Sequence, residues 1–433
     1  MLISKNNFNR IFAWVKASEF VKNIAVVMTG TAIAQLLGFL LSPIISRLYS
    51  PYDFGVYGSF DAILSVIAAG VTLDYSQAIM LPKDKVNALN LFVLSCLSTF
   101  IISCLALSLC LTIPSLIFGL INSKDIWILM MLVVGILVAG LNQSFQAWCI
   151  RVKEFKHTSG SQIVRSISSN GTQVLLGYCN GGGRSLIFAT ILGNVLASIN
   201  LTKVLISDLF VSKDQIKWKR IKKLAFDYRD FPMYSASQNV LNSLSRGLGV
   251  LLLGHFFGVA VAGAYVFAVR IISVPRRFVL MALRQVLFQR VCETKNLGAP
   301  LLPLYLKSTF GLFALTFFPV LVIVIWSVPI VTWIFGAQWY LAGEFTRFLV
   351  LWLMVGFCNV PAELFAKAIR IQRFVFFYDL TLLLARATAL LLGGLYFSAL
   401  DTVILFATVG AFMNVILILR VGYAAKKYDE RRE

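Results

Sequence analysis

Uncharged apolar runs about as long as a bilayer is thick constrain this chain more than any other feature. The first such run, residues 24–46, contains no charged side chain and is long enough to cross a membrane as a helix. A second run at 56–80 follows a short polar elbow at 47–55. Because lipid offers no hydrogen-bond partners to the backbone, this pattern predicts a hairpin of two membrane helices.

Similar runs recur to the end of the sequence. Of the 433 residues, 59% are hydrophobic and only 13% are charged, which excludes a soluble globular protein. The alternation over about 10 residues that a membrane β-barrel requires is absent from the sequence. We therefore predict an all-α polytopic membrane protein. Its twelve predicted transmembrane helices lie at 24–46, 56–78, 88–113, 126–150, 158–179, 186–206, 233–257, 263–286, 302–326, 343–362, 374–397 and 400–422.

The longest break between predicted helices lies at mid-chain, where the sequence KDQIKWKRIKK begins at Lys213. This break divides the helices into two groups of six. The predicted domains are a cytoplasmic amphipathic segment at 1–22, an N-terminal six-helix bundle at 23–206, a basic cytoplasmic linker at 207–230, a C-terminal six-helix bundle at 231–423 and a cytoplasmic tail at 424–433.

The two halves carry a trace of an internal repeat. A shift of 208 positions places residues 47–66 over residues 255–274 and pairs Gly55 with Gly263. Because each half has an even number of crossings, both halves insert the same way up. We therefore predict two bundles related by a pseudo-two-fold axis along the membrane normal, with a central cleft between them.

The distribution of basic residues predicts the orientation. The chain has 39 Lys and Arg against 19 Asp and Glu, a net charge of +20. In a soluble protein this excess would suggest nucleic acid, but in a membrane protein it marks the cytoplasmic loops, so we expect no nucleic-acid partner. Loops on the N-terminal side hold most of the basic residues, and the opposite side has only Arg47, Lys124 and Arg184. Both termini are therefore predicted to be cytoplasmic.

Arginines inside the predicted helices are the strongest candidates for substrate contact. In the eighth helix, Arg270, Arg277 and Arg284 are spaced by seven residues and share one face, with Arg276 beside them. Such a cationic wall suits an anionic substrate, because a guanidinium group binds phosphate or carboxylate in a bidentate manner. The alternative is ion pairing with acidic residues of neighbouring helices.

Two further helices are unusually polar. Arg165 lies among serines, asparagines and glutamines in the fifth, and Arg246 has similar neighbours in the seventh. Such faces avoid lipid and suit water or sugar hydroxyls, although helix packing through small residues is an alternative. Other basic residues in the helices, such as Arg386, receive no role. The predicted cationic cavity consists of Arg165, Arg246, Arg270, Arg276 and Arg277.

Four acidic residues lie in or at the edge of the predicted helices, where an ionised group needs a polar partner. Asp61 falls one position from the repeat mate of Arg270, so a pair between them could act as a gate or as a static ion pair. Asp74, Glu363 and Asp379 could titrate if the chain is a transporter coupled to protons, or they could lie at helix edges with structural roles.

No pattern indicates a cofactor, a metal site or catalytic residues. The seven cysteines are scattered without a CxxC pair, and there are only two histidines. The glycine-rich stretch at 180–184 is not followed by the GK[ST] of a nucleotide-binding loop. If the chain is a transporter, its energy would therefore come from an ion gradient or from the concentration of the substrate.

Two stretches resemble a known family. Residues 42–83 contain SPIISRLYSPYDFG and end in YSQAIMLPK, which resembles the opening of the bacterial oligosaccharide flippases, the O-antigen and capsule repeat-unit translocases. The stretch FGAQWYLAG at 335–343 is similar to the FG-x-x-W-x-x-AG segment of that family. This polysaccharide-transporter branch shares a superfamily with the multidrug exporters, and the likeness covers nearly the whole chain. The prolines, glycines and aromatic residues of both stretches are expected to shape elbows.

The resemblance implies a flippase, not an enzyme. Such a flippase moves a polyprenyl-pyrophosphate-linked oligosaccharide from the cytoplasmic to the periplasmic leaflet of the bacterial inner membrane by alternating access. Its expected partners are that lipid-linked glycan, membrane lipid, a coupling ion (H⁺ or Na⁺) and the glycan polymerase machinery.

Two alternatives stay open. One is a membrane polymerase or ligase of the same lipid-linked glycans, which would be expected to carry a large outer loop that this chain lacks. The other is a cation-coupled drug exporter of the sister branch, whose substrates favour an acidic cavity over a basic one.

Overall fold

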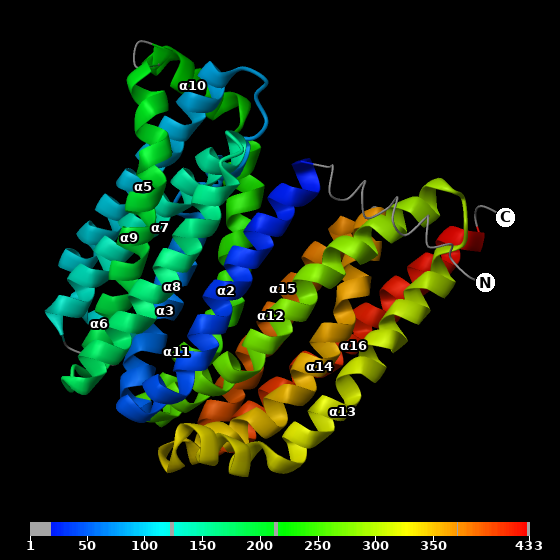
Figure 1. Cartoon of the computed structure of the whole chain (residues 1–433). Coiled ribbons are helices and arrows are strands. Elements are labelled where there is room, and N and C mark those ends of the chain that lie inside the picture. The colour runs from blue at the N-terminus through cyan, green and yellow to red at the C-terminus, as the bar shows by residue number, and fades with distance from the viewer. Residues whose placement is uncertain (1–18, 122–124, 212–214, 370, 431–433) are drawn as a thin grey trace. The chain divides into compact units, whose positions relative to one another are not determined.

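The computed structural model describes residues 19–121, 125–211, 215–369 and 371–430, and in these ranges the chain is helical almost throughout, with no strand (Figure 1). Most of the predicted amphipathic segment at 1–22 lies outside the described residues. The elements run in the order α2 (Glu19–Leu48), α3 (Pro51–Gly70), α4 (Tyr75–Ala78), α5 (Lys85–Thr112), α6 (Pro114–Ile121), α7 (Ile126–Arg151), α8 (Phe155–Tyr178), α9 (Gly182–Val211), α10 (Trp218–Asp227), η2 (Phe231–Ala236), α11 (Ser237–Phe257), α12 (Val259–Asn296), α13 (Leu301–Phe335), η3 (Ala337–Trp339), α14 (Tyr340–Ala368), α15 (Gln372–Tyr396) and α16 (Ala399–Glu430).

Each predicted transmembrane helix falls on helical structure, so the predicted all-α membrane fold is confirmed. Nine helices of the described part are long and apolar enough to span a bilayer, and Val259–Val274 is a shorter apolar stretch. The second predicted helix, 56–78, is interrupted. Helix α3 ends at Gly70, and Leu73 and Asp74 adopt left-handed backbone angles before α4 begins. A continuous helix cannot pass through two residues with positive φ.

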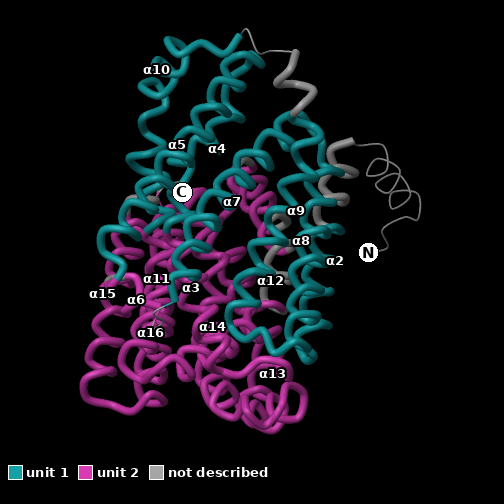
Figure 2. Tube along the Cα trace, turned by 90° about the vertical axis from the view of Figure 1, so that its left-hand side faces the viewer, with its two compact units in different colours: residues 1–45, 67–114, 125–240 teal, residues 46–66, 115–124, 241–433 magenta. Residues whose placement is uncertain are grey.

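The described helices form two compact units, shown in different colours in Figure 2. Residues 51–66 of α3 pack with the second unit, although they come early in the chain. The domain boundaries drawn from the sequence remain a prediction. The first unit holds the described parts of 1–45, 67–114 and 125–240, and the second holds those of 46–66, 115–124 and 241–433.

Polar contacts and small residues join the helices of the first unit. Ser95 of α5 and Ser144 of α7 share a hydrogen bond of 2.7 Å between their buried hydroxyls. The Asn142 amide of α7 donates to the Ser198 hydroxyl of α9 at 2.9 Å. Helix α9 lies so close to α8 that a Cβ on Gly193 would come within 2.9 Å of the Arg165 carbonyl oxygen. Close backbone approach and interhelical hydrogen bonds are the usual means by which membrane helices associate.

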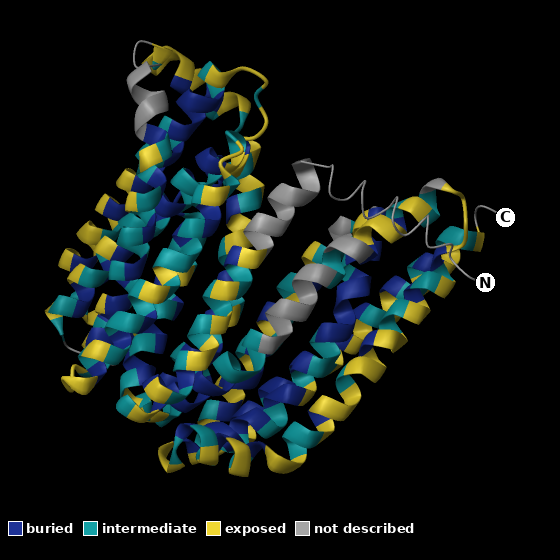
Figure 3. Ribbon diagram, viewed as in Figure 1, coloured by how far each residue is buried: buried dark blue, intermediate teal, exposed yellow. Residues whose placement is uncertain are grey.

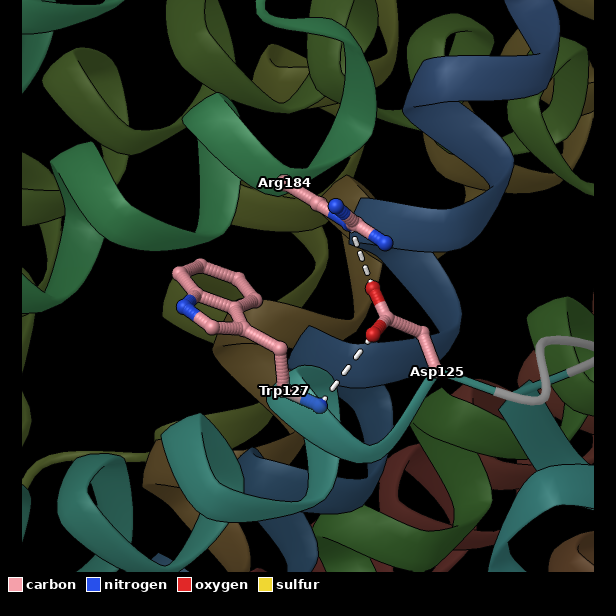
Figure 4. A network of polar contacts seen from close by, with 3 residues as sticks. All are labelled: Asp125, Trp127 and Arg184. Atoms are coloured by element: carbon pink, nitrogen blue, oxygen red, sulfur yellow. Dashed lines mark hydrogen bonds and ion pairs between the residues drawn. The ribbon is translucent and has the colours of Figure 1, made fainter.

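The start of α7 is tied to the start of α9 by one carboxylate (Figure 4). Asp125 caps α7 by accepting a hydrogen bond of 3.1 Å from the backbone N–H of Trp127. Its second oxygen accepts from the Arg184 guanidinium of α9 in an ion pair. A capping carboxylate satisfies a backbone donor that the helix leaves open, and here it also fixes the neighbouring helix.

Helix α14 is the centre of the second unit and packs against α12, α13 and α16. In the most apolar 18-residue stretch of α14 and its first turn, 61% of the residues are buried. In the corresponding stretch of α13 only 11% are buried, and Figure 3 shows this contrast. A core of aromatic and aliphatic residues surrounds it, in which the Tyr305 and Phe365 rings meet edge to face at 5.2 Å. The long apolar face of α13 is therefore free to contact lipid.

Helices α3 and α12 cross at very short range within the second unit. A Cβ on Gly55 would lie 1.9 Å from the Val259 carbonyl oxygen, and one on Gly263 would lie 1.8 Å from the Pro51 carbonyl oxygen. Under the 208-residue shift, Gly55 corresponds to Gly263 and Pro51 to Val259. The two contacts are therefore reciprocal, which is the arrangement expected where two repeated helices meet about a two-fold axis.

The two stretches that carry the family resemblance contact one another in the second unit. The Trp339 indole N–H donates to the Ser46 carbonyl at 2.8 Å, and the Gln338 amide donates to the same oxygen at 2.6 Å. The Trp339 ring stacks on Phe267 at 3.9 Å and meets Phe54 edge to face at 5.1 Å. Elbow-forming roles for these residues agree with this geometry.

Candidate functional site

A polar cavity of about 820 Å³ lies within the second unit. All of its lining residues belong to that unit, and they come from α3, α11, α12, α14, α15 and α16. Most are small, hydroxyl-bearing, amide or aromatic side chains. Its ionisable charged residues are Asp61, Arg246, Glu363, Asp379 and Arg386.

Arg386 is a buried cation in the wall of this cavity. Its side chain is only 8% exposed and lies over two aromatic rings, 4.8 Å from the centroid of Trp352 and 5.5 Å from that of Phe406. Its Nη1 donates to the Ser245 hydroxyl at 3.3 Å. A planar guanidinium suits such stacking, because the negative faces of aromatic rings attract cations.

Arg246 also lines the cavity but is exposed. Its Nη2 donates to the Ser243 hydroxyl, one helical turn earlier in α11, at 2.9 Å. Helix α11 comes close to α3 here, because a Cβ on Gly247 would lie 3.4 Å from the Ala62 methyl group. Asp61, the neighbour of Ala62, lines the same cavity. The structure thus brings together two residues that the sequence analysis selected for different roles.

The other arginines predicted for the site lie elsewhere or outside the description. Arg270 of α12 is half-buried, and its guanidinium carbon lies 6.0 Å from the centre of the Phe54 ring of α3. Arg276 and Arg277 fall within α12, but their side chains are outside the described part of the structure. Arg165 of α8 is exposed on the first unit.

The polar face of α8 is used in part for packing against α2 in the first unit. The Ser166 hydroxyl donates to the Ala34 carbonyl at 2.6 Å. A Cβ on Gly30 would overlap the Ser159 hydroxyl, and one on Gly38 would touch the Asn170 amide. The serines and asparagines that suggested a cavity lining thus also allow two helices to approach closely.

Two of the four predicted carboxylates, Glu363 and Asp379, line the cavity from α14 and α15. Glu363 of α14 accepts from the Arg284 guanidinium of α12 at 2.7 Å. Glu363 and Arg386 are the charged groups that act on Asp379 of α15. Asp74 is buried in the first unit, before α4, and is therefore not part of this cavity.

The inner wall carries a neutral hydrogen-bond network. The Asn359 amide of α14 and the Tyr378 hydroxyl of α15 both donate to the Asn414 side-chain oxygen of α16, at 2.7 and 3.1 Å. Three helices thus hold one another through a single acceptor. With three carboxylates, two guanidinium groups and several aromatic rings, the cavity can offer hydrogen bonds of both polarities.

Sequence reasoning named Arg246, Asp61, Glu363 and Asp379 but missed Arg386. The available signal was a basic residue near the centre of an otherwise apolar helix. Its partners could not be anticipated, because Ser245, Trp352 and Phe406 come from three other helices.

Comparisons with known proteins agree with this architecture. A family profile described as polysaccharide biosynthesis protein matches residues 44–344. No curated protein matches the chain.

Several solved transporter structures share the fold. An inward-facing multidrug resistance MATE family transporter of the MOP superfamily is 18% identical, with a TM-score of 0.69 over 91% of this chain and 96% of that one. The lipid II flippase MurJ, in an inward closed conformation, is 14% identical, with a TM-score of 0.70 over 90% of this chain and 86% of that one.

A third structure belongs to a MOP superfamily transporter from Pyrococcus furiosus, whose binding pocket has a reverse polarity that suggests a different function. It is 14% identical, with a TM-score of 0.58 over 95% of this chain and 96% of that one. At these identities the structures establish a common fold and nothing more. The family profile covers most of the sequence, however, and this multi-pass membrane protein belongs to the polysaccharide biosynthesis protein family.

Proposed function

We propose that the protein is a flippase for a polyprenyl-pyrophosphate-linked oligosaccharide, such as an O-antigen, capsule or related surface glycan repeat unit. It would carry this unit from the cytoplasmic to the periplasmic leaflet of a bacterial inner membrane. The observation that carries the proposal is membership of the polysaccharide biosynthesis family over residues 44–344. The fold shared with a lipid II flippase supports it.

The cavity chemistry is suited to a sugar. Carboxylates and amides accept and donate hydrogen bonds to hydroxyl groups, and the apolar faces of sugar rings can pack on aromatic side chains. The cavity offers both, with Asp61, Asp379 and Asn359 among its polar residues and Trp352 and Phe406 among its rings. The polyprenyl tail would remain in the lipid.

The pyrophosphate would be balanced by the predicted arginines. Arg165, Arg246, Arg270, Arg276 and Arg277 remain the candidates for this role. Among the candidates whose side chains the structure describes, Arg246 alone both lines the cavity and is exposed, so we place it first. Because Arg386 is already stacked on two rings and hydrogen-bonded to Ser245, we assign it to shaping the wall.

The carboxylates are candidates for a gate or for coupling to an ion. Glu363 and Asp379 both line the cavity, and Glu363 is a charged group that acts on Asp379. Asp61 could pair with an arginine as the transporter changes state, and Asp74 could act from the first unit. Contact with glycan polymerase machinery is part of the same proposal.

One observation favours a second candidate, a cation-coupled drug exporter. The cavity carries three carboxylates and several aromatic rings, and this combination attracts organic cations. The two candidates predict different losses in a deletion strain. A flippase mutant loses surface glycan, whereas an exporter mutant becomes sensitive to cationic drugs with its glycan intact.

The direct test is deletion of the gene in a strain without a paralogue. We expect loss of surface polysaccharide and accumulation of lipid-linked repeat units on the inner side of the membrane. Restoration of both by the wild-type gene links the effect to this protein. Normal surface glycan in the deletion strain would refute the flippase proposal.

Complementation by variants then tests the site. Arg246→Gln should lower surface glycan severalfold or more, because the bound pyrophosphate would lose a charged partner. Arg420→Gln is a matched control, since that exposed guanidinium lies over the Phe374 and Tyr423 rings of α15 and α16, away from the cavity lining. Equal complementation by both variants at equal expression would return Arg246 to a structural role.

A further inference from the structure

Helix α10 covers one end of the first unit and is attached there by its apolar side. Ile221 and Leu224 are both buried, and Leu224 belongs to the core that also contains Trp148 and Leu89. The Tyr75 hydroxyl donates to the Ala225 carbonyl of α10 at 3.4 Å. The position of this helix is therefore fixed by packing on α5 and its neighbours, with the opposite side turned outward.

The segment entering α10 is also held to α5. The Asn90 amide of α5 donates to the Gln215 carbonyl at 3.2 Å, and its oxygen accepts from the Lys217 backbone N–H at 3.2 Å. Asn90 is fully buried and lies in the second turn of α5, a helix long and apolar enough to span the bilayer. Helix α10 is thus fixed at the level where a membrane-spanning helix begins, which is the depth of the lipid headgroups.

The outward side of α10 combines lysines with an exposed aromatic ring. At 100° per residue, Lys219, Lys223 and Phe226 lie opposite Ile221 and Leu224. The Phe226 side chain is 66% exposed, although burial of such a ring is normally favourable. A large apolar group held in the middle of a basic face is typical of helices that lie at a membrane surface.

The charge on this side is strongly positive. Between 217 and 230 the exposed basic side chains outnumber the acidic ones, which are Asp227 and Asp230. Arg229 lies over the Phe226 ring, with its guanidinium carbon 4.6 Å from the centroid, and Lys222 lies 5.8 Å from the centre of the exposed Trp218 ring. The exposed basic residues are Lys217, Lys219, Arg220, Lys222, Lys223 and Arg229.

We propose that this surface, defined by Trp218, Lys219, Lys222, Lys223 and Phe226, binds the headgroups of anionic phospholipids in the adjacent leaflet. The aromatic rings would enter the interface while the lysines contact phosphate groups. Lysine is suited to this role because its flexible ammonium group follows mobile phosphates without needing a fixed geometry. This inference does not depend on the transported substrate.

The experiment uses the full-length protein in nanodiscs of phosphatidylcholine with increasing amounts of phosphatidylglycerol. Retention of phosphatidylglycerol is followed by native mass spectrometry, and hydrogen exchange is followed in peptides that cover 217–230. We expect exchange in this segment to slow as phosphatidylglycerol rises. Each lysine near a charged surface contributes about fivefold at low salt, so K219Q/K222Q/K223Q should weaken retention by on the order of 100-fold. High salt should reduce the difference, because the charges are exposed.

A matched triple variant separates this surface from net charge. K83Q/K156Q/K427Q removes three exposed lysines outside α10 and should weaken retention much less than the α10 variant does. Equal losses of phosphatidylglycerol retention in the two triple variants would overturn the proposal. Hydrogen exchange in 217–230 that does not change with the phosphatidylglycerol content would also overturn it. Equal slowing of exchange by inorganic pyrophosphate in detergent would also overturn it, since the ligand would then be a phosphate and not a lipid surface. F226S tests the aromatic part and should weaken retention without changing the salt dependence.

Discussion

Trp339 joins segments of the second unit that are 293 residues apart in the chain. It is fully buried, donates to the Ser46 carbonyl, and stacks on Phe267. Its position follows from Gly336, whose φ of +113° turns the chain sharply between α13 and η3. Residues with a side chain rarely adopt that backbone angle, so the turn requires a glycine. This turn positions the Trp339 indole. One residue of the second family-like stretch therefore holds the first stretch in place.

Replacement of this tryptophan should be costly. Trp339→Ala removes a large buried ring and a hydrogen bond, and we expect a loss of about 3–5 kcal/mol in the free energy of unfolding. Thermal unfolding of the purified protein in detergent measures this as a large fall in the midpoint. Trp333→Ala is the control, because that ring is 81% exposed and should have little effect. Similar midpoints for the two variants would contradict the structural role of Trp339.

Asp84 gives a pH-dependent prediction at the start of α5. A hydrogen bond of 2.9 Å from the backbone N–H of Asn87 holds the pKa of its carboxyl below the usual range. The ionised carboxylate therefore stabilises the folded state above the unfolded pKa of about 3.9, and this is lost as pH falls through the lower folded value.

Asp84→Ala should cost about 1 kcal/mol at pH 7 by removing the helix cap, and the difference from wild type should shrink below about pH 4. Thermal unfolding at several pH values measures the difference. Asp230→Ala, at an exposed carboxylate before η2, is the control. A constant difference between wild type and Asp84→Ala at all pH values would show that the ionised carboxylate is not the stabilising form.

The site was only partly predictable at this scale. Arg246, Asp61, Glu363 and Asp379 stand out because a charge inside an apolar run is conspicuous. Arg386 stands out for the same reason, but its stacking on Trp352 and Phe406 depends on tertiary packing that no periodicity records. The polar face of α8 suggested a cavity, whereas part of it packs on α2. The polarity of a helix face predicts that the face avoids lipid. It does not predict whether the face contacts a cavity or another helix.

At the scale of elements, the crossing of α3 and α12 was more predictable than the sites. The weak repeat aligned Gly55 with Gly263, and the structure uses both glycines in one reciprocal contact. Gly58 and Val266 correspond to each other under the same 208-residue shift, and they are also in contact. A Cβ on Gly58 would lie 2.4 Å from a Val266 methyl group. Membrane helices cross this closely only where one side has no Cβ. The repeat therefore carries packing information despite its low identity.

Because the contact is reciprocal, equivalent substitutions should have equivalent effects. Gly55→Ala and Gly263→Ala each place a methyl group against a backbone carbonyl oxygen, and we expect each to cost about 1–3 kcal/mol or more. The double variant should cost less than the sum, because both methyl groups widen the same crossing. Thermal unfolding in detergent, with expression level as a second measure, tests this.

Gly311→Ala is the control for these substitutions. No atom beyond its own helix lies within 4 Å of that added methyl group in the described structure, so alanine should be neutral or stabilising by about 0.5–1 kcal/mol. Strict additivity of the Gly55 and Gly263 effects would mean that the two contacts are independent. Such a result would contradict the shared crossing.

The limits of element prediction have physical causes. The apolar runs predicted the positions of the helices because hydrophobicity is a local property. They did not predict the residues at which the helices end. Helix α3 stops at Gly70 within a run that remains apolar, and α13 continues to Phe335 although its predicted segment ended at residue 326. Backbone turns at Leu73 and Asp74 after α3, and at Gly336 after α13, set these ends. Composition records neither of them.

At the scale of the whole molecule, charge acts in two ways. Exposed lysines and arginines gather in loops and in α10. Inside the second unit, arginines and carboxylates occur together around one cavity. The net charge of +20 therefore describes the surface of the chain better than its cavity, where carboxylates outnumber guanidinium groups among the described lining residues. A substrate with both sugar and phosphate groups is compatible with this separation.

The loop charges predict an orientation in the membrane, and this prediction can be tested on the whole chain. Reporter fusions should show the C-terminus and the linker near Arg229 on the cytoplasmic side, and the turn at Asn180 on the outer side. The reason is that the basic residues of the linker resist translocation, whereas the loop after α8 contributes only Arg184. Alkaline phosphatase fused after Asn180 should therefore be active and the same enzyme fused after Arg229 inactive, with fluorescent-protein fusions giving the opposite pattern. Because α8 and α9 are separated by a tight turn, a fusion at Asn180 reports on both helices at once. Active phosphatase at Arg229 or at the C-terminus would reverse the orientation, and a flippase in that orientation would have to load its substrate from the outer leaflet.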